Sequence, residues 1–349
     1  MAATPPVSTY AVEAGDVARD REAVLATWRG NLGEDARMQA KYDWFYARCP
    51  YGEPTVRLLR HAPDEAIVGA AAAGPRRLVA DGKTFDAGVL VDLAVTPEHR
   101  SLGPALMLQA ALAEAGVQRF GLLYGFPNPK AAAVFKRVGY EKFGDIVRHA
   151  RVLRHASYVQ RRLPRVLAVP GGWVLDRLDT LKAWWRRRAD ARVSTRWSER
   201  TDPRFDSLWA RSPSYHAVTA VRDAAFTRWR FDDSPLANTR FLLAEDANGT
   251  LVAWFACQED NGLLHVRDFW SEHGNAGVAR AHVDALLRAA RRLGVAAVSV
   301  EFGGSAQAFS GWAACGFVER TRRPVFGRWS NPGAAHERGL YLTSADEDE

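Results

Sequence analysis

The chain has 349 residues, of which 47% are hydrophobic and 25% charged, as expected for a globular protein with enough apolar material for two domains. The net charge of +7 comes without a zinc-finger, RRM-like or KH-like motif, which argues against nucleic-acid binding. No apolar run reaches the ~18–20 residues of a membrane-spanning helix. The three cysteines (Cys49, Cys257 and Cys315) are too far apart for a disulfide framework or a metal site. We therefore expect a cytoplasmic protein without a metal ion.

Two stretches of the sequence follow the same pattern. In the first stretch Pro50 follows Trp44, and in the second Pro235 follows Trp229 after the same number of residues. Two predicted strands come next in each stretch: 55–61 and 66–73, then 239–245 and 250–257.

An apolar strand with one acid follows in both stretches. It spans residues 89–95 around Asp92, and residues 263–270 around Asp268. A long helix, a short apolar strand and a helix ending in Gly-aromatic complete each pattern. The sequence therefore predicts two copies of one α+β fold, each a mixed sheet flanked by helices.

The domain organisation follows from this repeat. We expect one copy at 7–155, a second at 195–333 and an acidic disordered tail at 334–349. The segment between the copies, 156–194, is predicted to be basic, amphipathic and helical. Within it, residues 157–192 fit either a helix packed on the domains, which we favour, or a helix in peripheral contact with a membrane.

The sharpest chemical signal is the turn between Val95 and Ala105. An apolar strand ends there and a helix begins, with Pro104 expected at the first helical position. Unpaired N–H groups at a helix start attract an anion. Gly103 lets a ligand approach the backbone, and Arg100 adds a cationic fork for phosphate oxygens. The turn therefore predicts a diphosphate site.

This turn, Arg100-x-x-Gly103-x-Ala105, resembles motif A of the GNAT superfamily of N-acetyltransferases. The segment from Asn128 to Tyr140 resembles the motif B of that family, and the two motifs stand in the family's order. The resemblance covers most of the first copy and, in degenerate form, the second. It implies tandem GNAT folds that use acetyl-CoA, or another acyl-CoA, to acylate a small-molecule amine.

The resemblance also implies how the cofactor is held. Its diphosphate would lie on the turn, and its pantetheine would pair with the preceding strand where that strand separates from the next. The implied cofactor-binding residues are Leu93, Val95, Arg100, Ser101, Leu102, Gly103, Pro104, Ala105, Asn128 and Phe135. A plain N-cap role would also explain Asn128. In the second copy Glu272 stands in the turn and Ser305 replaces Asn128, so we expect no CoA there.

The resemblance makes Asp92 the candidate base that takes a proton from the amine. A structural carboxylate paired with an arginine is the alternative, which the matching Asp268 favours. The motif B position that usually carries a tyrosine acid is Phe135. Tyr140 is the candidate acid in its place, with Tyr124 as a further choice.

We therefore expect an acetyl-CoA-dependent N-acyltransferase that acts on a primary amine. By analogy with tandem GNAT proteins of bacteria, the acceptor class would be an amino sugar or a cell-envelope or polysaccharide precursor. Two alternatives remain open. The first is a Fem-type aminoacyl-tRNA-dependent transferase, which would not need the diphosphate turn. The second is a non-catalytic CoA-binding or scaffold protein, which would explain why Phe135 replaces the usual tyrosine acid.

Overall fold

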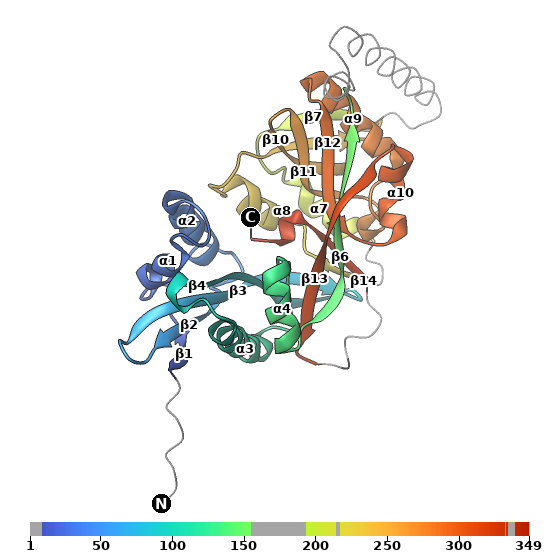
Figure 1. Cartoon of the computed structure of the whole chain (residues 1–349). Helices are drawn as coiled ribbons and strands as arrows, with labels where there is room; N and C mark the ends of the chain where they lie inside the picture. Colours follow the sequence, from blue (N-terminus) through green and yellow to red (C-terminus); the bar gives the residue numbers. More distant parts are fainter. Residues whose placement is uncertain (1–8, 155–192, 214–216, 332, 334–338, 349) are drawn as a thin grey trace, which may run out of the picture.

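The computed structural model describes residues 9–154, 193–213, 217–331, 333 and 339–348, and their strands form one fourteen-stranded mixed sheet flanked by helices (Figure 1). The first copy contains β1 (Tyr10–Gly15), α1 (Arg21–Trp28), α2 (Asp35–Lys41), η1 (Tyr42–Tyr46), β2 (Thr55–His61), β3 (Ala66–Ala80), β4 (Lys83–Val95), η2 (Pro97–His99), α3 (Leu102–Arg119), β5 (Leu122–Gly125), α4 (Pro129–Val138) and β6 (Glu141–Val152).

The second copy begins with β7 (Ser194–Ser198), α7 (Arg204–Arg211), β8 (Ala217–Ala220), α8 (Ala224–Thr227), η3 (Arg228–Asp232), β9 (Arg240–Glu245), β10 (Leu251–Asp260) and β11 (Leu263–Ser271). It continues with η4 (Gly274–Ala276), α9 (Arg280–Leu293), β12 (Ala297–Gly303), α10 (Ala306–Ala314), β13 (Val318–Trp329), β14 (Gly339–Thr343) and η6 (Ser344–Asp346).

The predicted repeat corresponds to repeated structure. The strand pair expected at 55–61 and 66–73 is β2 and β3, and the pair expected at 239–245 and 250–257 is β9 and β10. β3 is longer than predicted because it continues to Ala80, pairing with β4 on one side and with β8 of the second copy on the other.

The two copies exchange their last strands. β13 of the second copy lies between β5 and β6 of the first, with Phe326 opposite Gly125 and Val318 opposite Ala150. β6 lies in turn beside β12 of the second copy along residues 147–152. The strand order is therefore β1-β2-β3-β4-β5-β13-β6-β12-β11-β10-β9-β7, and neither copy closes its sheet with its own strands alone.

The repeated tryptophans form the contact between the copies. The rings of Trp44 and Trp229 are stacked with their centroids 5.1 Å apart, and both are buried. Trp44 Nε1 donates to the Trp229 carbonyl at 2.7 Å, and Trp229 Nε1 donates to the Trp44 carbonyl at 3.5 Å. The sequence repeat thus marks a symmetrical interface at the centre of the molecule.

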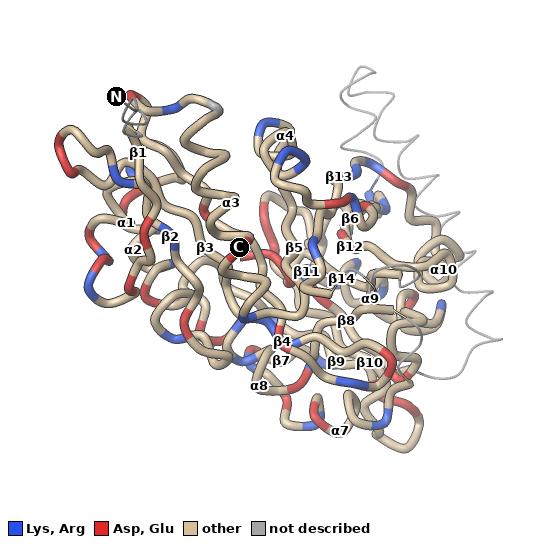
Figure 2. The backbone as a smooth tube through the Cα atoms, turned by 90° about the horizontal axis from the view of Figure 1, so that it is seen from below, with Lys and Arg blue, Asp and Glu red and all other residues tan. Residues whose placement is uncertain are grey.

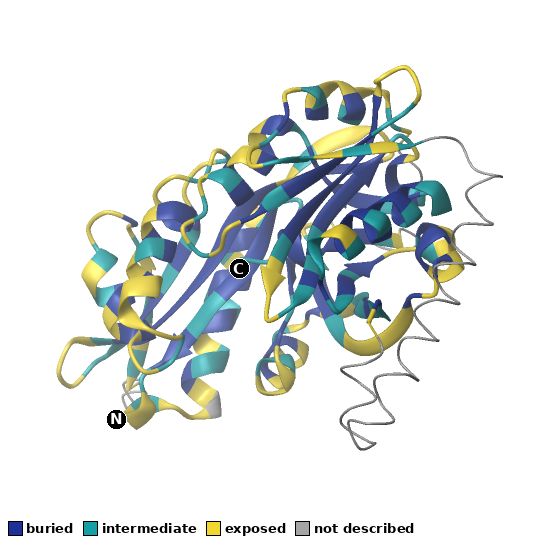
Figure 3. Ribbon diagram, turned by 90° about the horizontal axis from the view of Figure 1, so that it is seen from above, coloured by how far each residue is buried: buried dark blue, intermediate teal, exposed yellow. Residues whose placement is uncertain are grey.

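Buried residues follow the strands of the sheet (Figure 3). The larger core cluster runs through both copies and includes the aromatic residues of η1 and η3. A smaller cluster, with Leu108 and Phe135, lies on the α3 and α4 side of the first copy. Val89 and Val91 of β4 belong to the larger cluster and Leu90 to the smaller, as strand alternation requires. The side chains on the two faces of β4 therefore meet different surroundings.

The segment expected to be an acidic disordered tail, 334–349, is ordered over residues 339–348. β14 pairs with β12 and β8, and the described chain ends between the two copies (Figures 1 and 2). Residues 334–338 and 349 lie outside the described residues. The structure differs from the expectation because cations hold the acids inside the protein. The pairs are Arg222 with Asp346, Arg323 with Glu347, and Lys41 with Asp348.

The segment between the copies lies almost entirely outside the described residues. This applies to the amphipathic helix expected at 156–194 and to the membrane contact considered for 157–192, apart from the start of β7 at Ser194. Among the described helices, none has the length and apolar character needed to cross a membrane.

The tryptophan contact predicts a stability effect. Trp44→Ala removes a buried ring and its hydrogen bond, so the free energy of unfolding should fall by about 3–5 kcal/mol. Urea denaturation measures this change. Trp329→Ala, at a half-buried position, is the control and should cost less. Equal losses for the two variants would show that the stacked pair is not a principal contact between the copies.

Candidate active site

The sheet of the first copy forks between β4 and β5. The two strands run parallel and pair over three positions only, ending with Val89 opposite Tyr124. Beyond this point β4 stays paired with β3 as far as Val95, whereas β5 ends at Gly125. The strands therefore part at the place where the resemblance implies that pantetheine lies.

A β-bulge lies in β4 at the fork. Asp92 has a φ of +55°, a left-handed conformation that residues other than glycine rarely adopt. The pairing register shifts between Ala70 and Ala72 of β3, so Asp92 and Leu93 both lie opposite Ala71. A bulge of this kind redirects a side chain and takes backbone groups out of the ladder. Both effects occur here beside the gap between β4 and β5.

The turn after β4 is open to solvent. α3 begins at Leu102, and Ser101 stands at its N-cap without a side-chain capping bond. Ser101 and Gly103 are exposed, and a side chain added at Gly103 would meet no atom within 4 Å. Because the helix begins two residues earlier than expected, Pro104 lies inside the first turn, where its missing N–H still costs no helical hydrogen bond. The N–H groups of this turn are therefore accessible to an anion.

Arg100 is placed beside this turn. Its side chain is exposed, and its guanidinium donates to Asn31 Oδ1 and, at 3.4 Å, to the Val95 carbonyl. These contacts hold a permanent positive charge next to the uncapped start of α3. Backbone N–H groups and a guanidinium together are suited to bind a diphosphate.

A cluster of polar side chains surrounds Asp92 on the opposite side of β4 from α3. Lys41 Nζ donates to Asp92 Oδ1 at 2.7 Å, and Tyr46 Oη donates to Asp92 Oδ2 at 2.9 Å. Lys41 also pairs with Asp348 from the C-terminal segment. The side chains of Lys41 and Asp92 are only 7% and 4% exposed, and that of Asp348 is 24% exposed. Asp92 is therefore a nearly buried carboxylate with two donors.

These surroundings shift the proton affinities of the cluster. Burial raises the pKa of Asp92 to about 6, although Lys41 opposes the shift. Burial also raises the pKa of Tyr46 well above its usual range. Burial lowers the pKa of Lys41, but Asp348 and Asp92 outweigh it and leave this pKa above its ordinary value. Asp92 can thus change protonation near neutral pH, while Lys41 stays charged.

Comparison with known proteins identifies the fold. No protein family and no curated protein sequence matches the chain. Among solved structures, a probable N-acyltransferase from Enterococcus faecalis has a TM-score of 0.63 at 11% identity, over 93% of this chain and 73% of that one. A GCN5-related N-acetyltransferase from Kribbella flavida has a TM-score of 0.61 at 15% identity, over 95% and 74%.

The N-myristoyltransferase of Saccharomyces cerevisiae, solved with bound myristoyl-CoA, has a TM-score of 0.54 at 12% identity, over 97% of this chain and 90% of that one. The chain carries the GNAT fold twice. The expected fold class and the GNAT resemblance are therefore confirmed at the level of the fold.

In the first GNAT copy, Asn128 is the N-cap of α4. Its Oδ1 accepts hydrogen bonds from the N–H groups of Lys130 and Ala131, both at 3.0 Å. The side chain is exposed on the motif B side of the fork. The structural alternative for Asn128 is thus realised, and contact with a cofactor stays a prediction.

Phe135 and Tyr140 lie together inside the smaller core cluster. Their ring centroids are 4.9 Å apart, and both side chains are buried. The Tyr140 hydroxyl accepts a hydrogen bond from Gln109 at 3.2 Å, and burial raises the pKa of Tyr140. The structure does not bring Tyr140 and Asp92 together, because the partners of Asp92 belong to α2 and η1 on the other side of β4. Tyr124 is also buried, and its hydroxyl donates to the Asp346 carbonyl.

The C-terminal segment of the chain enters the fork of the second GNAT copy. β11 and β12 pair as far as Val266 opposite Val300. Beyond that point β14 pairs with β12, Thr343 opposite Phe302 and Leu342 opposite Gly303. The segment that follows the exchanged strand β13 thus lies where the second fork opens, and the expectation that this copy holds no CoA stays a prediction.

Asp268 differs from Asp92 in its partners. It accepts hydrogen bonds from Arg222 Nε at 2.9 Å and from Thr343 Oγ1 at 2.8 Å, and both Asp268 and Arg222 are fully buried. Arginine does not release its proton in proteins, so this pair is a fixed structural contact. Asp268 thus has the arginine partner that the structural alternative named for Asp92. The cation beside Asp92 is Lys41 instead.

Sequence reasoning missed Lys41, Tyr46 and Asp348. A signal for Tyr46 was present in the repeat: it follows Trp44 at the spacing with which Phe231 follows Trp229. Only the first copy therefore has a hydroxyl at this place. Lys41 and Asp348 carried no comparable signal, because they are 307 residues apart.

The buried cluster predicts the effect of removing its cation. Lys41→Met leaves two carboxylates without their charged partner, so we expect a loss of about 3–5 kcal/mol in the free energy of unfolding at pH 7. Urea denaturation is the measurement. Arg19→Met breaks the exposed Arg19–Asp20 pair and should leave the free energy of unfolding almost unchanged, because exposed ion pairs contribute little. A small loss for Lys41→Met would show that the cluster is better solvated than its burial indicates.

Proposed function

We propose that this protein is an acyl-CoA-dependent N-acyltransferase that acts through its first GNAT copy. The observation that carries the proposal is the difference between the two forks. The first has an open turn with uncapped N–H groups and an arginine, whereas β14 enters the second and pairs with β12 there. A fork kept open beside an anion-binding turn suits the diphosphate and pantetheine of a CoA thioester.

Acetyl-CoA is the proposed co-substrate, and the residues around the turn fit it. The backbone of Ser101–Ala105 and the guanidinium of Arg100 would hold the diphosphate. Backbone groups of β4 at the bulge, near Leu93, lie outside the β3 ladder and would pair with pantetheine. When bound, the cofactor supplies the activated acyl group.

Asp92 is proposed as the base. It would accept the proton that the amine must lose as its nitrogen bonds to the thioester carbon and the carbon–sulfur bond breaks. Lys41 and Tyr46 would position this carboxylate from the other side. At the family's usual acid position stands Phe135, which has no proton to give, and Tyr140 is held apart in the core. The thiolate would therefore take its proton from another source.

The proposed acceptor is a small primary amine. The carboxylates of Asp92 and Asp348 would attract an ammonium group before it loses its proton. Amino sugars and precursors of cell-envelope polysaccharides are the first class to test. The runner-up is a non-catalytic CoA-binding or scaffold protein, which Phe135 favours. A Fem-type transferase would require tRNA binding and would leave the open turn unused.

The turn predicts the binding of acetyl-CoA. Isothermal titration calorimetry should detect acetyl-CoA, and Gly103→Glu should weaken its binding at least about tenfold, because a carboxylate beside the diphosphate repels it. Ala281→Glu places the same charge at the second residue of α9 in the other copy and should leave binding unchanged. An absence of binding at millimolar acetyl-CoA would contradict the proposed function.

The raised pKa of Asp92 predicts a pH dependence. A base works when ionised, so kcat/KM with an amine acceptor should be high above pH about 6 and fall as the pH drops through that value. Asp92→Asn should lower kcat about 10²–10⁴-fold, measured as thiol release from acetyl-CoA across an amine panel. Asp86→Asn, at an exposed acid of the same strand, should change little. Full turnover by Asp92→Asn would exclude Asp92 as the base.

The same assays separate the alternatives. Tight acetyl-CoA binding without turnover of any amine would favour the scaffold function. Co-purifying tRNA in a protein with no affinity for CoA would favour the Fem-type transferase.

A further inference from the structure

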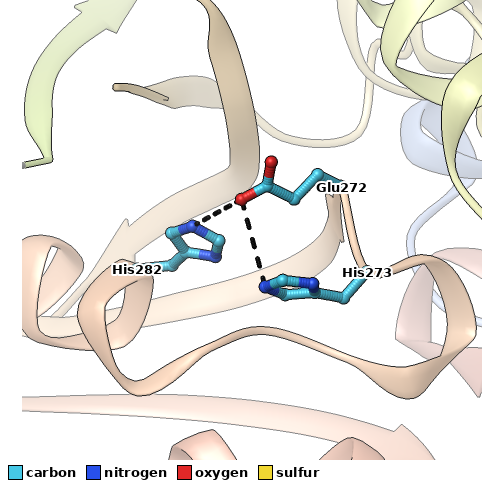
Figure 4. Close-up of side chains that lie close together, drawn as sticks. All are labelled: Glu272, His273 and His282. Carbon is cyan, nitrogen blue, oxygen red and sulfur yellow. Dashed lines mark ion pairs between the residues drawn. The ribbon is translucent and has the colours of Figure 1, made fainter. Parts of the chain in front are cut away.

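Three side chains of the second GNAT copy converge at the turn that corresponds to the diphosphate turn of the first. Glu272 and His273 directly follow β11, and His282 lies in the first turn of α9 (Figure 4). Glu272 Oε1 is 3.7 Å from His282 Nε2 and 4.0 Å from His273 Nε2. The ligand atoms of all three lie within 4.8 Å of one another.

These separations are too long for hydrogen bonds and slightly too long for a shared metal ion. Hydrogen bonds of this kind are about 2.7–3.2 Å. Ligand atoms around a tetrahedral zinc ion, at about 2.0–2.1 Å from the metal, are about 3.3 Å apart. The side chains of Glu272 and His273 are 40% and 48% exposed, so small rotations of these two can close the difference.

His282 provides a second, independent observation. Its side chain is 4% exposed, and its Nδ1 is buried without a hydrogen-bond partner among the described residues. Its Nε2 faces Glu272 beyond hydrogen-bonding distance. A buried imidazole whose Nδ1 has no partner and whose Nε2 faces a carboxylate without a hydrogen bond is suited to bind a metal ion.

The loop that carries two of the three residues is fixed by contacts of its own. Ser271 Oγ donates to the Gly277 carbonyl at 2.6 Å and accepts from the His273 N–H at 3.1 Å. Gly274 has a φ of +60°, and any side chain there would collide with the Pro213 carbonyl. The backbone of this turn is therefore held in place without help from the three converging side chains.

We propose that Glu272, His273 and His282 bind a divalent transition-metal ion, with Zn²⁺ as the first choice. Two imidazoles and one carboxylate are donors that zinc accepts, whereas Mg²⁺ and Ca²⁺ require oxygen ligands. Three protein ligands leave a fourth position for water or an exchangeable anion. The positive end of α9 opposes a cation only weakly, and the Glu272 carboxylate offsets it. This site would connect the end of β11 to the start of α9.

The three cysteines, far apart in the sequence, predicted no metal site. Glu272 was noted solely as a residue that would repel a phosphate. Under the proposal, the turn that attracts an anion in the first copy would correspond to a turn that binds a cation in the second. It does not depend on the proposed acyl transfer.

The test is zinc binding by the full-length untagged protein after treatment with a chelator. Competition with a chromophoric chelator should give about one Zn²⁺ per chain. Glu272→Gln, His273→Ala and His282→Ala should each weaken binding at least about tenfold. Substitution by Co²⁺ should give the intense visible absorption of a four- or five-coordinate ion, and this absorption should be lost in the same variants.

His61→Ala is the matched control. His61 pairs with Asp64 at 2.9 Å and packs on His99, so this cluster of the first copy also brings histidines and a carboxylate together. Zinc binding should be unchanged in this variant. Because His282 is buried, the exposed Glu272 and His273 decide the outcome where His282→Ala fails to fold. Three results would overturn the proposal. The first is no zinc binding at micromolar concentrations, the second is zinc binding that both Glu272→Gln and His273→Ala retain, and the third is zinc binding that His61→Ala abolishes.

Discussion

The pairing of buried carboxylates with buried cations is the constraint on which the arrangement of this protein depends. A carboxylate away from water is costly unless a cation and hydrogen bonds satisfy it. Arg222 meets this need for Asp268 and Asp346, and Lys41 meets it for Asp92 and Asp348. These pairs fix the C-terminal segment between the copies. Because β14 belongs to that segment, the same pairs also determine what enters the second fork.

The two copies therefore use one fold for different purposes. Their forks, acid-bearing strands and following helices correspond, yet the surroundings do not. In the first copy the acid meets a lysine and a tyrosine hydroxyl, beside the place where the pairing of β4 and β5 ends. In the second it meets an arginine and a threonine with no exposed surface. The two copies thus share a scaffold and differ in the side chains that surround its acid.

Local features of the sequence predicted much of the fold and of the site. The turn with Arg100 and Gly103 follows from a strand, a turn and a helix that are adjacent in the chain, and the GNAT resemblance implied the fork. The strand exchange could not be predicted, because the apolar pattern of β13 says which face is buried and not which copy supplies the neighbour. The acidic segment misled for a related reason: its partners Lys41, Arg222 and Arg323 lie far away in sequence. The charge of a run of acidic residues does not say whether that run is solvated or buried.

The strand exchange has a consequence for how the chain folds during its synthesis. When β5 and β6 have left the ribosome, the strand that belongs between them has not yet been made, since β13 lies about half the chain later. Both strands then present unpaired edges, which are prone to join other chains. Contacts between such distant segments also slow folding. Cutting the gene into its two halves should thus yield fragments that associate or aggregate rather than two independent domains.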